Sequence, residues 1–410
     1  MSKIILHIDL NQFFVRCEEI KNPNLIGKPV IIGHDGRGGI VSTCSYEARK
    51  FGIKSGMPTF MAIKLNPKVI MIPGDYKFYS SMSRKFINFI KTKATNIEQA
   101  SIDECYVDMT KELKDVKNVE QYLLDMQNEL YEKTGLKCSI GVAPTKFLAK
   151  MGSDMKKPMG LTIIRRKDIR KMIYPLPISD FYGIGKKTTP KLEKIGIKTI
   201  GDLAIRVNND DKVIKNELGK FFFAVKDMIN GQSSDYVDSE PFDPKSIGNS
   251  HTLPFDTNSY NDLKENLVIL AEEVSQRAKE ANKVGTTVQV VLKDNGFKVI
   301  NRSISFSKPT NDFDTIKSYT IQLLDKNYDS EKMIRLVGVT LQNLINPSEV
   351  TIQMSIFDDF EKIKEECATK LLISELNRKM NKSVFKTAAE LELEKRNGSK
   401  WCNRFIHPIP

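Results

Sequence analysis

Two adjacent acids, Asp103 and Glu104, interrupt a stretch that otherwise has the apolar character of a buried β-strand, ASIDECYVDM. Neighbouring side chains of a strand point to opposite faces, so these carboxylates can share a ligand only where the backbone bends. Two charged carboxylates held away from water would cost several kcal/mol unless a cation or a proton neutralises them. We therefore expect a tight turn or bulge here, and a neutralising partner opposite both acids.

A third acid, Asp9, ends the apolar run of residues 3 to 8. Three carboxylates at strand ends, without a His or Cys in the set, form a hard oxygen site that suits Mg²⁺ or Mn²⁺. Two such ions would activate an attacking hydroxyl and stabilise a leaving phosphate, as in phosphoryl and nucleotidyl transfer. Taken alone, the three residues leave another interpretation open, in which Asp103 and Glu104 are ordinary turn residues and Asp9 caps a strand.

The size and charge of the chain limit its class. With 410 residues it is too long for one core, and we expect two to four domains. Hydrophobic residues make up 40% and charged residues 28%, which is typical of a soluble globular protein. The net charge of +12 favours a polyanionic partner such as nucleic acid, with a membrane surface as the weaker alternative.

The six cysteines form no CxxC pair and have no His at metal-site spacing, so they indicate free thiols in a reducing compartment. The N-terminal stretch KIILHIDL is too short, and carries His7 and Asp9 too early, for a signal peptide. No apolar run approaches the length of a membrane span. These features predict a cytoplasmic protein that does not enter a membrane.

Hydrophobic periodicity divides the chain into regions with different predicted secondary structure. Up to residue 165, strand-like runs such as PVIIG and KCSIGV alternate with helix-like stretches, which predicts an α/β or α+β region. Short helices with glycine turns follow from Tyr174, and past Gly231 a polar, acidic segment is typical of a linker. From Ser246 to Ile345 the pattern predicts strand, helix, strand, strand, helix, strand, with a hairpin at residues 294–296.

The hairpin region of this βαββαβ unit is basic. It is a candidate phosphate-facing sheet, and an ordinary solvated basic face is an equally acceptable interpretation. The residues concerned are Lys283, Lys293, Lys298, Arg302 and Lys308.

Three further clusters could bind phosphate. Tyr46 and Arg49 lie three residues apart, on one face of a helical turn, where a phenol and a guanidinium could hold phosphate oxygens. Lys156 and Lys157 precede a Pro-containing turn. So many phosphate ligands fit a triphosphate substrate better than the phosphodiester of a nuclease. Gly183 and Gly185 lie between two helical segments, where backbone N–H groups could approach a nucleic-acid phosphate.

Five motifs in this order resemble the Y-family translesion DNA polymerases, most closely the bacterial DNA polymerase IV group. They are HIDLNQFF, STCSYEARKFGIKSGMP, ASIDECYVDM, KCSIGVAPTKFLAKMGSDMKKPMG and YGIGKKTTPKLEKIGI. The resemblance implies an α+β, right-hand architecture with palm, fingers, a helical thumb and a βαββαβ little finger. It divides the chain into palm (1–18 and 77–166), fingers (19–76), helix-hairpin-helix thumb (167–232), linker (233–245), little finger (246–346) and C-terminal tail (347–410).

The resemblance also implies a metal site. It places two Mg²⁺ ions, or Mn²⁺, on Asp9, Asp103 and Glu104, with the carbonyl of Leu10 as a further ligand. There the primer 3′-hydroxyl would attack the α-phosphate of a deoxynucleoside triphosphate. Many relatives read DxD at the first motif, whereas here Asn11 takes the second position. Only the first acid is a ligand in the family, so we expect activity to survive this difference.

Substrate contacts follow from the same resemblance. It assigns the triphosphate to Thr43, Tyr46, Arg49 and Lys157, the steric gate against a ribose 2′-hydroxyl to Phe14, and packing beside the sugar to Phe13. It assigns the grip on DNA to the thumb and little finger, at Gly183, Gly185, Lys186, Lys293, Lys298 and Arg302.

The tail carries one more motif, QMSIF, which resembles the short peptide with which bacterial polymerases bind the β sliding clamp. It comprises Gln353, Met354, Ser355, Ile356 and Phe357. The spacing of Phe360, Ile363, Cys367 and Leu371 predicts a tail helix with these residues in one stripe. Neither this helix nor Trp401 has an assigned role.

Together these features predict a monomeric, template-directed DNA polymerase of low fidelity that uses primer-template DNA and dNTPs and copies past damaged bases. A non-catalytic module that occupies primer ends and the clamp is one alternative, but it would be marked by loss of a metal ligand, and all three acids are present. A metal-dependent nuclease or cyclase on a palm-like core is another. Tyr46, Arg49 and Lys157 argue against the nuclease, and the glycine hairpin argues against the cyclase.

Overall fold

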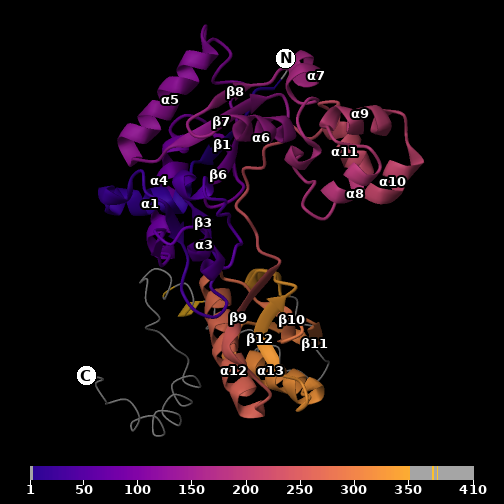
Figure 1. Ribbon diagram of the computed structural model, residues 1–410. Coiled ribbons are helices and arrows are strands. Elements are labelled where there is room, and N and C mark those ends of the chain that lie inside the picture. The colour runs from indigo at the N-terminus through magenta and orange to yellow at the C-terminus, as the bar shows by residue number, and fades with distance from the viewer. Residues whose placement is uncertain (1–2, 351–371, 374–375, 377–410) are drawn as a thin grey trace.

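The computed structural model describes residues 3–350, 372, 373 and 376, and it contains three β-sheets with helices packed around them (Figure 1). The strand order is β5-β6-β1-β7-β8 in the five-stranded sheet, β3-β2-β4 in the three-stranded sheet and β11-β10-β12-β9 in the four-stranded sheet. The strands are β1 (Ile5–Leu10), β2 (Val30–Ile32), β3 (Thr43–Cys44), β4 (Ile70–Ile72), β5 (Asn96–Gln99), β6 (Glu104–Asp108), β7 (Cys138–Ala143), β8 (Leu161–Ile163), β9 (Ser246–Thr257), β10 (Gly285–Asp294), β11 (Val299–Thr310) and β12 (Ile334–Gln342).

Helices connect these strands and build a separate helical region between β8 and β9. The α-helices are α1 (Phe13–Lys21), α2 (Tyr46–Arg49), α3 (Thr59–Leu65), α4 (Tyr76–Lys91), α5 (Val119–Thr134), α6 (Lys146–Met155), α7 (Ile169–Met172), α8 (Thr189–Lys194), α9 (Ile200–Asn208), α10 (Lys212–Leu218), α11 (Phe221–Ile229), α12 (Tyr260–Glu280) and α13 (Phe313–Asn327). Short 3-10 helices are η1 (Pro23–Leu25), η2 (Arg166–Asp168), η3 (Ile178–Asp180) and η4 (Pro347–Glu349).

The five-stranded sheet separates two cores. Alternation along β1 sends Leu6, Ile8 and Leu10 into a core with residues of α4 and α5. His7 and Asp9 alternate with these residues and point to the other face, where α6 contacts β1, β7 and β8. That helix lies close to the sheet, because a Cβ built on Gly141 of β7 would fall 1.9 Å from the carbonyl oxygen of Ala149. The polar residues of β1 are therefore enclosed between the sheet and α6.

The second core extends from α6 through the helical region α7–α11 and includes part of the predicted linker. Val237 is buried in this core. The backbone of Lys146 donates to Ser234, and the N–H of Asp238 donates to Glu98 Oε2 at 2.8 Å. The polar segment after Gly231 thus begins as a strap attached to the five-stranded sheet, and only its later residues span to β9.

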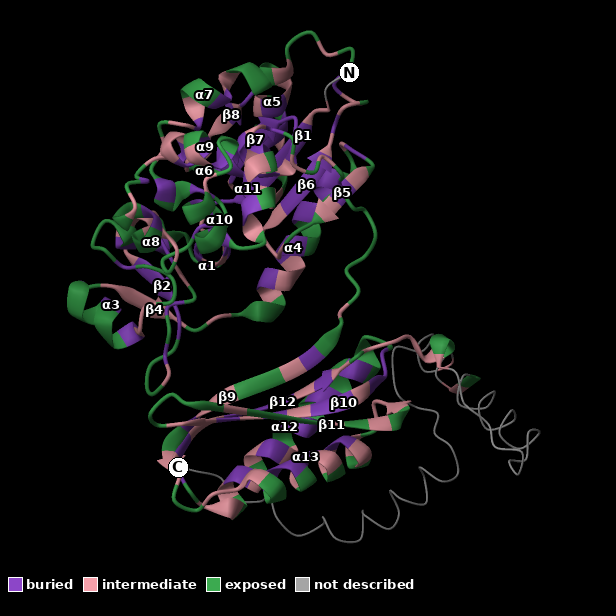
Figure 2. Cartoon of the chain, turned by 90° about the vertical axis from the view of Figure 1, so that its right-hand side faces the viewer, coloured by how far each residue is buried: buried purple, intermediate pink, exposed green. Residues whose placement is uncertain are grey.

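The four-stranded sheet confirms the βαββαβ pattern predicted for residues 246–345. The apolar stripe of α12 is buried against it, as are residues of α13. In Figure 2 both helices lie on the side of this sheet away from the rest of the chain. The opposite face of the sheet is therefore turned toward the five-stranded sheet and the helical region.

The three-stranded sheet is small, and its core includes Ile31 of β2, Val41 and Ala48. Four cysteines, Cys17, Cys44, Cys105 and Cys138, are free and buried. Within the described residues, no helix is long and apolar enough to cross a membrane. The QMSIF peptide, the stripe predicted from Phe360 to Leu371, and Trp401 all lie outside the described residues.

Candidate active site

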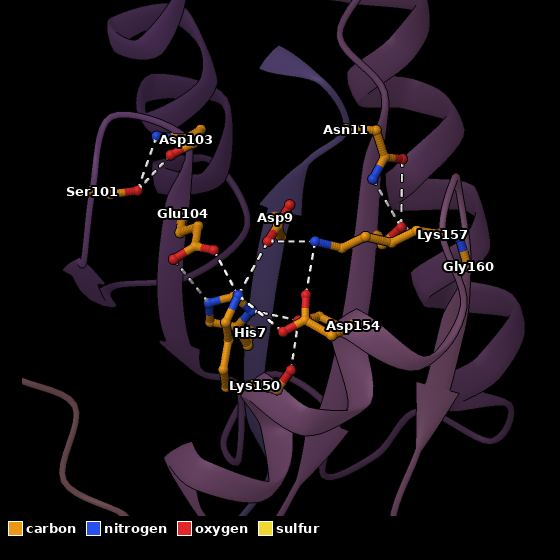
Figure 3. Close-up of polar contacts among 12 residues, drawn as sticks. His7, Asp9, Asn11, Ser101, Asp103, Glu104, Lys150, Asp154, Lys157 and Gly160 are labelled. Atoms are coloured by element: carbon orange, nitrogen blue, oxygen red, sulfur yellow. Dashed lines mark hydrogen bonds and ion pairs between the residues drawn. The ribbon is translucent and has the colours of Figure 1, made fainter. Parts of the chain in front are cut away.

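Strand pairing brings the three acids predicted as metal ligands to one end of the five-stranded sheet. Asp9 on β1 is the register partner of Glu104 on β6. Asp103 lies in the bend just before β6, and its carbonyl accepts a hydrogen bond from the N–H of Leu10 at 2.9 Å. The bend predicted at Asp103 is thus confirmed, and residues about a hundred positions apart in the sequence are adjacent (Figure 3).

Two lysines neutralise this end of the sheet. Lys150 Nζ lies 2.6 Å from Glu104 Oε1 and 3.2 Å from Asp9 Oδ2, while Lys157 Nζ lies 2.8 Å from Asp9 Oδ2. Asp154 contacts both ammonium groups, at 3.3 and 2.8 Å. Of the two adjacent acids, Glu104 thus has the neutralising partner that the sequence led us to expect, whereas neither lysine pairs with Asp103.

Lys150 and Asp154 were not predicted as site residues from the sequence. A signal was present, because Lys146, Lys150, Ser153, Asp154 and Lys157 recur at helical spacing in one motif and so lie on one side of α6 and its C-terminal end. What the sequence did not reveal is that this side faces β1 and β6.

The carboxylate of Asp103 does not join the ion-pair cluster. Its Oδ1 accepts a hydrogen bond from Ser101 Oγ at 2.6 Å. Among the described residues, no group of three or more His, Cys, Asp or Glu side chains is arranged to hold a metal ion. The donor chemistry nevertheless fits a hard divalent cation, which prefers oxygen ligands. The Lys150 ammonium already places a positive charge between the carboxylates of Asp9 and Glu104. The hydrogen bond from the Leu10 N–H to the Asp103 carbonyl holds the third acid at the same end of the sheet.

The pKa values of these side chains are shifted, because charged groups are crowded together and partly buried. Burial and the neighbouring Glu104 raise the pKa of Asp9 to about 6, against the opposing charge of Lys157. Burial would also raise the pKa of Glu104, but contacts with His7, Asp9 and Lys150 outweigh it and lower that pKa below its ordinary value. Burial lowers the pKa of His7, which favours its neutral form. The two acids therefore differ, and Glu104 is the one more firmly ionised.

The predicted triphosphate ligands gather beside Asp9. Tyr46 and Arg49 lie on α2, with the guanidinium 4.9 Å from the centre of the Tyr46 ring. Burial raises the pKa of Tyr46, opposed by the charges of Arg49 and Lys157. The N–H of Tyr46 donates to Gln12 Oε1 at 2.9 Å, which ties α2 to the start of α1. Thr43 is half-buried on β3.

The predicted steric gate stacks in an aromatic group. The Phe14 ring lies 4.5 Å from that of Tyr79 with an interplanar angle of 15°, and Tyr76 meets it edge-on at 5.8 Å. Phe14 is half-buried, whereas Phe13 is only 3% exposed and belongs to the core beneath. Phe13 thus supports the ring of Phe14 from below, at 5.5 Å between centroids.

Asn11, the departure from the DxD pattern, has a structural role. It is buried, its Oδ1 accepts the N–H of Met159 at 2.7 Å, and its Nδ2 donates to Ser139 Oγ at 3.0 Å. Ser139 Oγ in turn accepts the N–H of Gly160. The amide therefore fixes the loop that carries Lys157.

Replacing Asn11 by Ala tests the predicted role of Lys157 as a triphosphate ligand. The change leaves the Met159 N–H unpaired, which costs about 1–3 kcal/mol, and frees the loop of Lys157. We expect a higher KM for dNTP and a lower unfolding temperature, measured by steady-state kinetics and calorimetry. Asn11→Asp is the matched control, because a carboxylate oxygen can still accept that N–H; an unchanged KM in Asn11→Ala would remove this role.

The residues predicted to contact DNA are only partly brought together. Gly183 has φ +103, and a Cβ there would lie 2.8 Å from Phe221 Cζ, so the hairpin needs glycine at this position. Gly185 has open space around it, and Lys186 is exposed. In the four-stranded sheet, Arg302 pairs with Val290, which is buried on the helix side, whereas Lys293 pairs with Val299 on the opposite face.

The predicted basic face of the sheet therefore needs correction. Because paired residues of a sheet project to the same side, Arg302 and Lys293 lie on opposite faces, and Lys298 is exposed in the hairpin. Lys283 is buried, with its Nζ 2.7 Å from Asn346 Oδ1 and in contact with Asp243. It fastens the linker and is not available to bind phosphate.

Comparisons with known proteins match successive parts of the chain to one family. The sequence matches profiles of the impB/mucB/samB family over residues 8–154, of the IMS family HHH motif over residues 166–197, and of the impB/mucB/samB family C-terminal domain over residues 244–356. It is 35% identical to a DNA polymerase IV of Bacillus velezensis, over 96% of this chain and 94% of that protein. It is 39% identical to a DNA polymerase IV of Alkaliphilus oremlandii, over 88% and 91% of the two chains.

Solved structures give the same result. A Y-family DNA polymerase chimera is similar with a TM-score of 0.73 and 28% identity, covering 84% of this chain and 99% of that chain. DinB from Sulfolobus solfataricus is similar with a TM-score of 0.57 and 28% identity over the same shares. These proteins have mixed helices and sheets, as this chain does.

Proposed function

Because this chain belongs to the DNA polymerase IV group of Y-family DNA polymerases, we propose that Asp9, Asp103 and Glu104 form the centre at which it adds deoxynucleotides to a primer. As a member of that group, it is a template-directed DNA polymerase of low fidelity that binds DNA and dNTPs. The observation that supports the assignment of the centre is the pairing of Asp9 with Glu104, next to the backbone bond between Leu10 and Asp103.

Y-family polymerases depend on divalent metal ions, and we propose two Mg²⁺ ions here, with Mn²⁺ as a substitute. When bound, such ions make the primer 3′-hydroxyl more acidic and stabilise charge on the leaving pyrophosphate. Asp9 and Glu104 would hold them with the carbonyl of Leu10, and Asp103 would turn from Ser101 to join them. Lys150 and Lys157 keep the two carboxylates neutralised until then.

The incoming nucleotide would lie between α2 and the loop after α6. Arg49 and Lys157 supply positive charge, and Tyr46 and Thr43 supply hydroxyl groups for the phosphate oxygens. Lys157, which now pairs with Asp9 at 2.8 Å, would exchange that carboxylate for a phosphate oxygen when the nucleotide binds. Phe14, supported by Phe13, would exclude a ribose 2′-hydroxyl.

We propose that the domains follow in the order of a right-hand polymerase. We assign the five-stranded sheet with α4–α6 to the palm, the three-stranded sheet with α2 and α3 to the fingers, α7–α11 to the thumb and the four-stranded sheet to the little finger. The face of this last sheet that turns toward the palm carries Lys293 and would lie along the DNA (Figure 2). Lys298, Lys186 and the glycines of the thumb hairpin would contact the DNA backbone, whereas Arg302 could reach it only around the edge strand β11.

A primer-extension assay tests the proposed activity. On an undamaged template with Mg²⁺ and all four dNTPs, the primer should lengthen, and single-nucleotide assays should show frequent misinsertion. On a template with one damaged base, synthesis should continue past the lesion. Absence of extension on both templates, with intact binding of primer-template DNA, would contradict the proposal.

We also propose that QMSIF binds the β sliding clamp, although it lies outside the described residues. Replacing Gln353 and Phe357 by Ala removes the polar anchor and an apolar contact of such a peptide, so clamp affinity should fall at least about tenfold. Synthesis without the clamp should not change. Equal affinity of the double variant for the clamp, measured by surface plasmon resonance, would make the motif a coincidence.

A monomeric state and a cytoplasmic location, both expected from the sequence, stay predictions. Sedimentation of the purified chain and fractionation of cells would test them.

A further inference from the structure

A buried histidine, His7, lies beside the proposed metal centre and has no role so far. It is fully buried in the middle of β1, and it points to the same face as Asp9. Its register partners are Tyr106 on β6 and Gly141 on β7, and its ring lies 4.7 Å from that of Tyr106. Its Nδ1 atom is 2.7 Å from Ser153 Oγ on α6.

The other ring nitrogen lacks a hydrogen-bond partner. Among the described residues none lies within hydrogen-bond distance of His7 Nε2, and the atom is buried. Leaving such a group unpaired costs about 1–3 kcal/mol, so a native structure that keeps it calls for an explanation. The polar atom that it faces is Glu104 Oε2, 3.8 Å away, while Lys150 holds the other oxygen of that carboxylate.

The position of the imidazole is fixed by close packing. Gly152 of α6 lies directly against Gly141 of β7, since a Cβ on Gly152 would be 3.2 Å from Gly141 Cα. The same turn of α6 carries Ser153 and Lys150. His7 is therefore enclosed between β1 and α6, whereas the Glu104 side chain is 27% exposed, so the carboxylate is the group with more room to move.

The neighbours also select the tautomer. If the Ser153 hydroxyl donates to Nδ1, the neutral ring carries its proton on Nε2, directed at Glu104. If the hydroxyl donates instead to the carbonyl of Lys150, which lies 2.9 Å away, the lone pair of Nε2 would face a carboxylate. The first arrangement is favoured, because it sets a donor opposite an acceptor.

We propose that His7 is a positioning residue for Glu104: held by Ser153, it donates its Nε2–H to Oε2 of Glu104 and so directs Oε1 toward the bound metal ion. The proposal rests on the assignment of Glu104 as a metal ligand. With Glu104 as a metal ligand, a small rotation of its carboxylate would close the 3.8 Å gap between Oε2 and His7 Nε2. Groups that orient a metal ligand in this way typically change metal affinity by about 10–100-fold when they are removed.

Three substitutions of His7 separate positioning from packing. Gln can place an amide N–H where Nε2 lies, Asn can place one only near Nδ1, and Phe keeps a ring against Tyr106 without any donor. The measurement is the affinity for Mn²⁺, followed by electron paramagnetic resonance of the free ion, with enzyme, a dideoxy-terminated primer-template and dNTP. We expect His7→Asn and His7→Phe to bind Mn²⁺ at least about tenfold more weakly, and His7→Gln to remain close to the parent enzyme.

Two further variants make the result decisive. Ser153→Ala removes the hydroxyl that orients the ring, so it should weaken Mn²⁺ binding, as His7→Asn and His7→Phe do. If the His7 variants fail to fold, Ser153→Ala still tests the proposal. Glu104→Gln should weaken Mn²⁺ binding most. If Glu104→Gln weakens binding while His7→Phe and Ser153→Ala leave it unchanged, the positioning proposal is wrong and the metal site stands. If Glu104→Gln also leaves binding unchanged, the metal site itself is wrong.

Discussion

Replacing Asp103 by Ala is expected to abolish primer extension while primer-template binding remains nearly intact. Removing a group that only orients a metal ligand already costs about 10–100-fold, so loss of a ligand should lower kcat by at least about 1,000-fold. Asp103 is the most informative of the three acids, because its carboxylate contacts Ser101 and neither lysine of the ion-pair cluster. Its removal therefore leaves Lys150 and Lys157 with their present partners, and the fold should persist.

The measurement is single-turnover incorporation with Mg²⁺, together with DNA binding by fluorescence anisotropy. Asp115→Ala is a matched control, since it removes an exposed acid on the connection that follows β6. The control should retain full activity. Full activity in Asp103→Ala as well would refute the site.

The second large effect concerns the choice of sugar. In Phe14→Ala the ring that would meet a ribose 2′-hydroxyl is absent, so the clash that discriminates against ribonucleotides disappears. Overpacking costs about 1–3 kcal/mol, and each 1.4 kcal/mol is about tenfold. The ratio of ribonucleotide to deoxynucleotide insertion should therefore rise on the order of 10–100-fold.

This ratio is measured from kcat/KM for matched rNTP and dNTP pairs. Phe14→Tyr keeps the ring over Tyr79 and should preserve discrimination, which makes it the control. The Ala variant also loses the stacking with Tyr79, worth about 0.5–1.5 kcal/mol, so its unfolding temperature should fall. A lower unfolding temperature with an unchanged ratio would mean that Phe14 supports the fold and is not the gate.

Local patterns were sufficient to predict much of the fold. Continuous apolar runs located β1 and β7, which are buried on both faces. Helical periodicity and the turn at residues 294–296 located α5 and the βαββαβ unit, whose helices bury one apolar face each. The bend at Asp103 was expected because neighbouring residues of a strand point to opposite faces, so Asp103 and Glu104 could share a ligand only at a bend.

These local patterns could not predict contacts between elements that are far apart in the sequence. Lys150 and His7 become part of the site only when α6 packs on β1 and β6, and the sequence does not state which face of α6 is covered. Arg302 was grouped with Lys293 because both are basic and near the hairpin, but strand register puts them on opposite faces. Lys283 was counted as exposed because its partners, Asp243 and Asn346, come from the linker and from the segment after β12.

The central claim is that three acids from separate segments hold two divalent ions between the primer end and the incoming nucleotide. Anomalous diffraction from crystals with Mn²⁺, primer-template DNA and a non-hydrolysable dNTP analogue tests it most directly. The account predicts two manganese peaks about 3.5–4 Å apart, bound by Asp9, Asp103 and Glu104, with Lys150 displaced from Glu104. Manganese peaks away from these residues, or an Asp103 still bound to Ser101 beside an occupied nucleotide site, would contradict it.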